Sequence, residues 1–131
     1  MALFMLDTDT VSFALRGIGR VAERLAKQQR SEICLSAITV AELRFGADKR
    51  RSRKIHKAID AFLSGVDVLA FDNTAAEKFG AVAATLASAG VPIGQMDTLI
   101  AGHALSLGAT LVTNNQRHFL KVSGLNVDNW T

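Results

Sequence analysis

The chain has 131 residues, of which 49% are hydrophobic and 21% are charged, with a formal net charge of +3. This length suits one domain that buries roughly two-thirds of its unfolded surface, and the composition excludes a disordered protein. The longest weakly polar stretch, 99–112, is shorter than the ~20 residues of a membrane-spanning helix, so we expect no membrane segment. No leader precedes the first predicted strand and the lone Cys34 cannot form an internal disulfide, which together favour the cytoplasm.

Short apolar or β-branched runs predict strands at 3–6, 33–35, 66–71 and 110–113, with a weaker fifth at 125–127. Between them, apolar residues recur at helical spacing. The four stripes are Ile18, Val21, Ala22 and Leu25; Ile55, Ile59, Phe62 and Leu63; Phe79, Val82, Ala83 and Leu86; and Leu99, Ile100, Ala104 and Leu105. Strands that alternate with helices predict one α/β domain over residues 1–131, with three layers and a short, mainly parallel central sheet.

Three acidic residues stand where a strand or a turn gives way to a helical pattern. Asp7 directly follows the first predicted strand, and Glu42 and Asp97 stand at two later junctions. In an open α/β sheet such junctions converge on one crevice at the carboxyl ends of the strands. Clustered carboxylates repel by roughly 1 kcal/mol per pair at 4 Å in water, and by about 4 at an effective dielectric of 20. We therefore expect a divalent cation between them, and hard oxygen ligands select Mg²⁺ or Mn²⁺ over zinc.

Each of these acids also has a local explanation. The segment Thr39-Val40-Ala41-Glu42 fits a capping box, and Asp97 stands where aspartate is a favoured N-cap. Asp7 must be solvated, capping or ligating, and Asp9 adds a further charge in the same turn. Three acids on three separate crossovers favour one shared site over three unrelated caps.

A basic run accounts for much of the positive charge. Residues 49–57 read KRRSRKIHK, with six Lys or Arg and one His, a density that attracts polyanions through counterion release. A solvated helix face beside a loop would explain the same run without any ligand. Together with an acidic metal site, the run favours a nucleic-acid substrate.

Four short motifs stand along the chain in a specific order and spacing. They are LDTD at 6–9, SAITVAEL at 36–43 followed by Gly46, IGQMDTLIA at 93–101, and LVTNN at 111–115. With this set the chain resembles the PIN-domain ribonucleases, specifically the VapC toxins of bacterial toxin-antitoxin pairs. The resemblance extends over nearly the whole chain, through Phe119 to the closing Asn129-Trp130.

The resemblance implies a PIN-like fold and a Mg²⁺- or Mn²⁺-dependent endoribonuclease in which Asp7, Glu42 and Asp97 are the metal-binding, catalytic acids. A metal held by carboxylates lowers the pKa of a water molecule and neutralises charge that grows on the phosphate, whether one or two ions bind. The resemblance also implies transfer RNA as target, cut in the anticodon loop, with initiator transfer RNA among the substrates. The implied partners are a second copy of the chain and a cognate VapB-type antitoxin, in a homodimer or a larger complex. An antitoxin peptide with an arginine could pair with the acids and displace metal.

The chain departs from the family pattern after the fourth predicted strand. The family often has acids in the segment that here reads Thr113-Asn114-Asn115-Gln116-Arg117-His118-Phe119. The two positions that could carry an acid are occupied by Asn115 and His118, whose side chains are neutral or nearly so. A second metal ion would lose a charged ligand there. Asp9 stands where the family commonly has asparagine and restores negative charge. We treat Asp9, Thr113 and Asn115 as accessory positions.

Basic residues around these motifs are candidates for RNA contacts. They are Arg44, Lys49, Arg50, Arg51, Arg53, Lys54, Arg117 and His118. Ordinary exposed loop residues would explain Arg117 and His118 equally well. His103, Cys34 and Trp130 are expected to pack in the core rather than take part in chemistry.

Two other functions compete with the nuclease. Asp7-Thr8-Asp9-Thr10-Val11 also matches the pattern of haloacid dehalogenase-like phosphatases, in which Asp7 would be the nucleophile and Asp9 an acid/base. That function leaves Glu42 unexplained. It also needs an acidic pair after a late strand, which this chain does not have. A catalytically idle RNA- or protein-binding PIN module is the other alternative, which the neutral Asn115 and His118 favour.

Overall fold

The computed structural model describes residues 2–131. Within this range the chain forms a five-stranded sheet and seven α-helices, with one 3₁₀ turn at Arg30–Glu32. The elements in order are β1 (Phe4–Leu6), α1 (Thr8–Arg16), α2 (Val21–Ala26), β2 (Ile33–Ser36), α3 (Ala37–Lys49), α4 (Arg53–Leu63), β3 (Asp67–Leu69), α5 (Asn73–Ser88), α6 (Gln95–Leu107), β4 (Thr110–Val112), α7 (Gln116–Phe119) and β5 (Val127–Asp128).

All the strands are parallel and their order across the sheet is β3-β2-β1-β4-β5. The order reverses at β1, which pairs with β2 on one edge and with β4 on the other. In open α/β sheets this reversal opens a crevice at the carboxyl ends of the strands. The chain that leaves β1 and β4 therefore defines the place where a ligand is expected.

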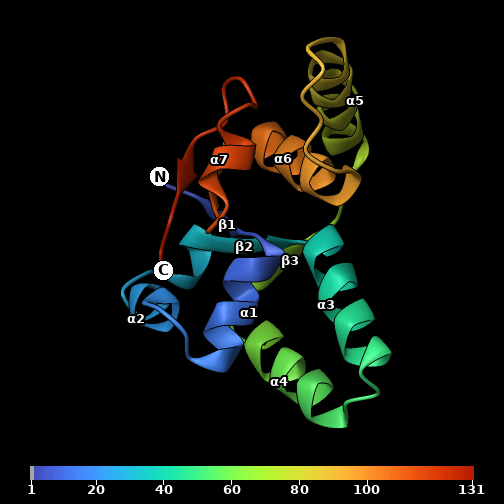
Figure 1. The fold of residues 1–131 in the computed structure, drawn as a ribbon. Helices are drawn as coiled ribbons and strands as arrows, with labels where there is room; N and C mark the ends of the chain where they lie inside the picture. The colour runs from blue at the N-terminus through green and yellow to red at the C-terminus, as the bar shows by residue number, and fades with distance from the viewer. Residues whose placement is uncertain (1) are drawn as a thin grey trace.

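Helices cover both faces of the sheet. Helices α5, α6 and α7 lie on one face, and α1 to α4 lie on the other (Figure 1). Successive strand residues supply the two cores alternately: Met5 and Leu111 pack under α5 and α6, whereas Leu6 and Val112 pack against α1 to α4. This alternation follows from the two-residue period of a strand. The predicted three-layer α/β/α domain with a short parallel sheet is confirmed.

The helical stripe predicted at 18–25 was wrong as a single element. The chain instead forms α1, ends it at Gly17, and starts α2 at Val21. Gly17 adopts a left-handed conformation (φ 67°), and the amide of Ile18 bonds to the carbonyl of Phe13 at 2.9 Å, which is a helix-ending arrangement. Ile18 is therefore an exposed turn residue, 44% accessible, and does not belong to a packed stripe.

The remaining strand and helix predictions place the elements correctly. The strands begin or end within two residues of the expected positions, and the last one is shifted to Val127–Asp128. The four-residue helix α7 was not predicted, because it is too short to produce a periodic pattern. No helix in the described part of the chain combines the length and apolar character needed to cross a membrane.

The residues expected to be structural are packed in the core. His103 is 1% exposed, bonds through Nδ1 to the Ser36 hydroxyl at 2.8 Å, and meets the ring of Phe71 edge-on. Burial lowers the pKa of His103 and raises the pKa of the Cys34 thiol to about 12, so both groups are kept neutral. Trp130 is 2% exposed and packs on Phe4, closing an edge of the core as expected.

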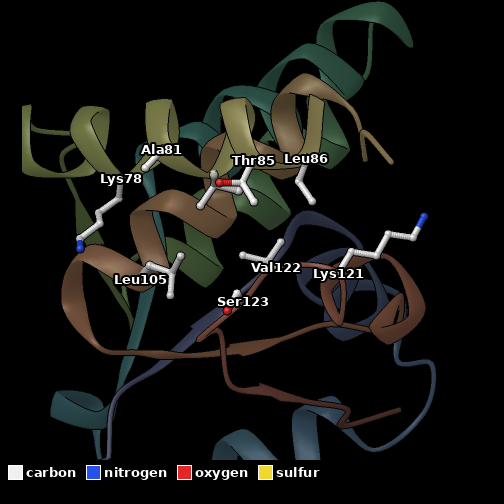
Figure 2. A pocket seen from close by; sticks show the side chains of 9 residues that line it. Lys78, Ala81, Thr85, Leu86, Leu105, Lys121, Val122 and Ser123 are labelled. Carbon is white, nitrogen blue, oxygen red and sulfur yellow. The ribbon is translucent and has the colours of Figure 1, made fainter. Parts of the chain in front are cut away.

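A pocket of about 260 Å³ opens between α5, α6 and the segment after α7 (Figure 2). Its wall is mainly apolar, and the amines of Lys78 and Lys121 point away from each other at its two ends. None of the predicted acidic residues lines this pocket. This apolar pocket and the acidic region are therefore different places on the molecule.

Candidate active site

Asp7 follows β1 and begins α1. Its amide donates to the carbonyl of Val112 at 3.0 Å, which continues the β1–β4 pairing by one residue. Its carboxylate accepts from the amide of Thr10 at 2.9 Å and so caps α1. The Thr10 hydroxyl donates to the Val112 carbonyl at 3.1 Å and fixes the turn to β4. Asp7 is only 5% exposed, so the acid at the reversal point of the sheet is both buried and rigidly held.

Glu42 does not cap a helix. Helix α3 begins at Ala37 and is capped by Ser36, whose hydroxyl accepts from the amide of Ile38 at 3.1 Å. The capping-box explanation of Glu42 was therefore wrong. Glu42 lies in the second turn of α3, and its carboxylate accepts a short hydrogen bond from the hydroxyl of Thr8 on α1. This contact joins two helices that follow adjacent strands.

Asp97 does not cap its helix either. Gly94 stands at the N-cap of α6 with φ 97° and ψ 151°, a conformation essentially confined to glycine, and Asp97 lies in the first helical turn. There it benefits from the positive end of the helix dipole. One of its oxygens lies 3.4 Å from Nδ1 of His118 on α7. Asp97, a predicted metal ligand, and His118, a predicted RNA contact, therefore lie next to each other.

The acids influence one another electrostatically. Burial raises the pKa of Asp7, of Glu42 and of Asp97 above the ordinary carboxyl range. Hydrogen bonds from Thr113 and Thr10 at Asp7, from Thr8 at Glu42 and from His118 at Asp97 oppose this rise. Repulsion by Asp9 raises all three pKa values, and Asp7 and Asp97 both raise that of Glu42. The four carboxylates therefore share one region, with Asp9 exposed at its edge.

The chemistry of the donors fits a hard divalent cation. The shared region offers carboxylate oxygens, which Mg²⁺ and Mn²⁺ prefer, and their mutual repulsion would be relieved by positive charge. As the side chains stand, no three Asp, Glu, His or Cys residues within 2–131 converge closely enough to hold a metal ion. Each of the three acids instead contacts a neighbour. Thr10 bonds to Asp7, Thr8 bonds to Glu42, and His118 lies beside Asp97. Metal binding would require Glu42 and Asp97 to turn away from these partners.

The accessory positions border this region. Thr113 is fully buried at the end of β4, where its hydroxyl accepts from the amide of Asn115 at 2.9 Å. Asn115 precedes α7 and is half-buried. Arg117, on the same short helix, is exposed, whereas the neighbouring His118 turns to Asp97. His118 thus supplies a neutral or positive group at a position that could have carried an acid.

The basic run forms the tip of the hairpin between α3 and α4. Its exposed side chains are Lys49, Arg50, Arg51, Arg53, Lys54 and Lys57. Arg51 has φ 51°, an unusual left-handed conformation for a side chain of this size. Figure 1 shows this tip at the far end of α3 from the sheet. Eight residues separate Glu42 from Arg50, which corresponds to about 12 Å along a helix.

Arg44 differs from the other basic residues. Its guanidinium pairs with Asp60 at 2.5 Å and bonds to Nδ1 of His56 at 3.0 Å, both on α4. His56 in turn lies 2.8 Å from Asp48 on α3. Arg44 is therefore already neutralised by a neighbouring acid, and it braces the hairpin that presents the basic tip.

Two residues that position the acids were not predicted from the sequence. Thr8 bonds to Glu42, and Thr10 holds both Asp7 and the end of β4. Both lie in the segment Asp7-Thr8-Asp9-Thr10, in which only the acids were predicted to be functional. The signal was present, because hydroxyl residues that alternate with acids directly after a strand are suited to hold those acids.

Comparison with known proteins gives a consistent result. The PIN-domain family model matches residues 4–125. The tRNA(fMet)-specific endonuclease VapC of Shigella flexneri is 38% identical over the full length of both chains, and Ribonuclease VapC2 of Haemophilus influenzae is 39% identical over 99% of each. In a crystal structure of DNA-bound VapBC from Salmonella typhimurium, one chain superposes with a TM-score of 0.90 at 38% identity, over the full length of both chains. These matches give no support to the phosphatase alternative. The chain belongs to the PIN-domain family and, within it, to the VapC proteins.

Proposed function

We propose that this protein is a divalent-metal-dependent endoribonuclease that acts as the toxin of a toxin-antitoxin pair. The observation that carries the proposal is the grouping of Asp7, Glu42 and Asp97. They come from three separate crossovers, yet their charges interact at the carboxyl edge of the sheet. A purely structural role does not explain why a fold would place carboxylates where repulsion by Asp9 helps to raise the pKa of Asp7, Glu42 and Asp97.

The chain's own residues would prepare this site for a cation. Asp7 is held in place because it caps α1, so it needs no movement. Glu42 would leave Thr8, and Asp97 would leave His118, to bind the ion. When bound, Mg²⁺ or Mn²⁺ would polarise a phosphodiester and make an attacking water more acidic. Released from Asp97, His118 would be free to contact a phosphate. Arg117 and the basic tip at 49–57 would guide the RNA backbone toward the acids.

We further propose transfer RNA as the substrate, cut in the anticodon loop, with initiator transfer RNA among the targets. The Shigella flexneri relative is described as specific for tRNA(fMet), and it aligns with this chain from end to end. A single-stranded loop is the part of an RNA whose bases can be splayed out and read. The VapBC complexes among the similar structures support a cognate VapB-type antitoxin, and we expect the toxin itself to be a homodimer.

The first test is cleavage of total cellular RNA by purified protein, with Mg²⁺, with Mn²⁺ or with EDTA. The wild-type chain should give discrete, metal-dependent fragments, from which the cut site is mapped. Asp7→Asn should reduce cleavage by at least about a hundredfold, the order seen when a group that stabilises the transition state is removed. Asn retains the helix cap, so the fold should be preserved.

Asp72→Asn is the matched control. Asp72 caps α5 through the amide of Ala75 at 2.9 Å, the same arrangement as between Asp7 and Thr10, but it lies outside the acidic region. Its substitution should leave cleavage unchanged. Equal cleavage by wild type and Asp7→Asn, or cleavage that EDTA does not affect, would reject the metal site. Intact RNA throughout, with metal binding shown by calorimetry, would favour an idle binding module.

A further inference from the structure

Phe45 is exposed although it is a large aromatic residue. Its side chain is 67% accessible, and it is the only aromatic among the large exposed hydrophobic residues of the described chain. The other phenylalanines and Trp130 are buried or half-buried. Removing a phenylalanine from water is favourable, so a ring that is two-thirds accessible has surface free to pack on a ligand, and the residues around it decide which ligand.

Phe45 lies beside the acidic region. It is three residues after Glu42 on α3, which places the two side chains on the same face of the helix. Side chains on a helix lean toward its N-terminus, so the ring of Phe45 extends toward the turn that carries Ala41 and Glu42. Ala41 is exposed and small, and it leaves space beside the ring.

Lys49 continues the same face in the direction of the basic tip. Its amine lies 5.9 Å from the centre of the Phe45 ring. Along α3 the chain thus presents an acid, an aromatic face and a cation in succession, at spacings of about 4.5 and 6 Å along the axis. This is the pattern of a single-stranded nucleic-acid site, in which bases stack on aromatic rings and cations hold the phosphates.

We propose that Phe45 is the stacking platform for one unpaired base of a single-stranded RNA, next to the phosphate that is cut. Lys49 would hold a phosphate of the stacked nucleotide, and Glu42 would face the reacting one. This inference rests on the proposed nuclease function and specifies how its substrate is held.

A protein contact is the other use for an exposed aromatic. Protein interfaces usually have an apolar centre, where charged residues are depleted. The exposed neighbours of Phe45 on this face are instead Asp48, Lys49 and the single methyl of Ala41. An isolated ring among charges fits a base between phosphates better than it fits a second protein surface.

The test uses short single-stranded RNAs with the sequence of the anticodon loop of initiator transfer RNA, the proposed substrate. Each nucleotide is replaced in turn by an abasic one, and both binding in EDTA and cleavage with metal are measured. Wild type should lose roughly ten- to a hundredfold in binding at one abasic position, as expected for the loss of one base stacked on an aromatic ring. Phe45→Ala should lose a similar factor on intact RNA and be insensitive to the abasic nucleotide at that position.

Conservative and remote variants complete the experiment. Phe45→Trp should bind as well as wild type, whereas Phe45→Leu, which keeps an apolar but not an aromatic surface, should behave as Phe45→Ala. Ile18→Ala removes another exposed hydrophobic residue, in the turn after α1, and should have no effect. Circular dichroism would verify that each variant is folded.

The outcomes separate the two proposals. If wild type binds RNA in a Phe45-dependent way but does not cut it, the stacking platform stands and the nuclease fails. If wild type cuts RNA and Phe45→Ala cuts it equally well with the same abasic profile, the platform is rejected and the nuclease stands. A changed oligomeric state of Phe45→Ala in light scattering, with unchanged RNA binding, would assign the ring to a protein interface and also reject the platform.

Discussion

Asp7 combines the two functions that a carboxylate after a strand can have. It caps α1 through the amide of Thr10, and it contributes charge to the acidic region. Its burial makes the charge costly, and the cap offsets part of that cost. The sequence could not reveal this combination, because a cap and a ligand occupy the same type of position. Glu42 and Asp97, by contrast, had plausible caps in the sequence and have none in the structure.

Neutralising Asp7 should stabilise the metal-free protein at neutral pH. The raised pKa means that folded Asp7 holds its proton more tightly than unfolded Asp7 does. The wild type therefore loses stability as pH rises from the ordinary carboxyl value, near 3.8, through the raised folded value. Asp7→Asn lacks this loss and keeps the cap. Urea denaturation in EDTA should show a higher free energy of unfolding for Asp7→Asn at pH 7 and no difference below about pH 3.5.

Two controls define this prediction. Asp72→Asn should change stability little at any pH, because Asp72 is an exposed cap. Mg²⁺ should stabilise wild type but not Asp7→Asn, by about 2.7 kcal/mol at a hundredfold excess over the dissociation constant. A less stable Asp7→Asn at pH 7 in EDTA would contradict the electrostatic argument and would mean that the carboxylate stabilises the folded state by its hydrogen bonds.

At the scale of elements, residue patterns predicted α4, α5 and α6 but not α1, the helix that Asp7 caps. No apolar stripe was predicted over Thr8–Arg16, and the predicted stripe at 18–25 lies wholly after Gly17. The boundary of α1 is set by the left-handed glycine rather than by hydrophobic spacing. The site depends on such local breaks, since Gly94 likewise sets the start of α6 and thereby the position of Asp97.

Gly102→Ala should destabilise the protein. Helices α5 and α6 approach so closely at Gly102 that a Cβ there would lie 2.7 Å from the backbone Cα and N of Phe79. Backbone atoms cannot move aside as the end of a side chain can, so the helices must separate. We expect a loss of about 1–3 kcal/mol, as for other overpacked sites, measured by urea denaturation.

Gly80→Ala provides the matched comparison on the opposing helix. Gly80 follows Phe79 in α5, is exposed, and has open space where a Cβ would stand. Alanine is the better helix former, so this substitution should stabilise the protein by about 0.5–1 kcal/mol. Equal effects of the two substitutions would show that helix propensity, and not the close approach of α5 and α6, decides the outcome at Gly102.

At the scale of the whole molecule, the parallel sheet made the meeting of the acids predictable. Strands alternating with helices imply carboxyl ends on one edge, and this sufficed to group Asp7, Glu42 and Asp97. The strand order β3-β2-β1-β4-β5 was not predictable, because short strands of similar composition do not specify their neighbours. The side-chain contacts Thr8–Glu42 and Asp97–His118 depend on that order, so only the structure reveals them.

The acidic region and the basic run lie at different places along α3, the first beside Glu42 and the second at the far tip. Reversing three residues of the basic run, Arg50→Glu, Arg51→Glu and Arg53→Glu together, should weaken RNA binding and flatten its salt dependence. If all three contact phosphates of a single strand, the slope of log K against log salt should decrease by about 2. Reversing Arg16, Arg20 and Lys27, exposed on or beside α1 and α2, changes the net charge equally and should lower affinity without changing the slope as much. Equal slopes for both triple variants would mean that RNA responds to the overall charge of the protein, and the tip would lose its assignment as a guiding surface.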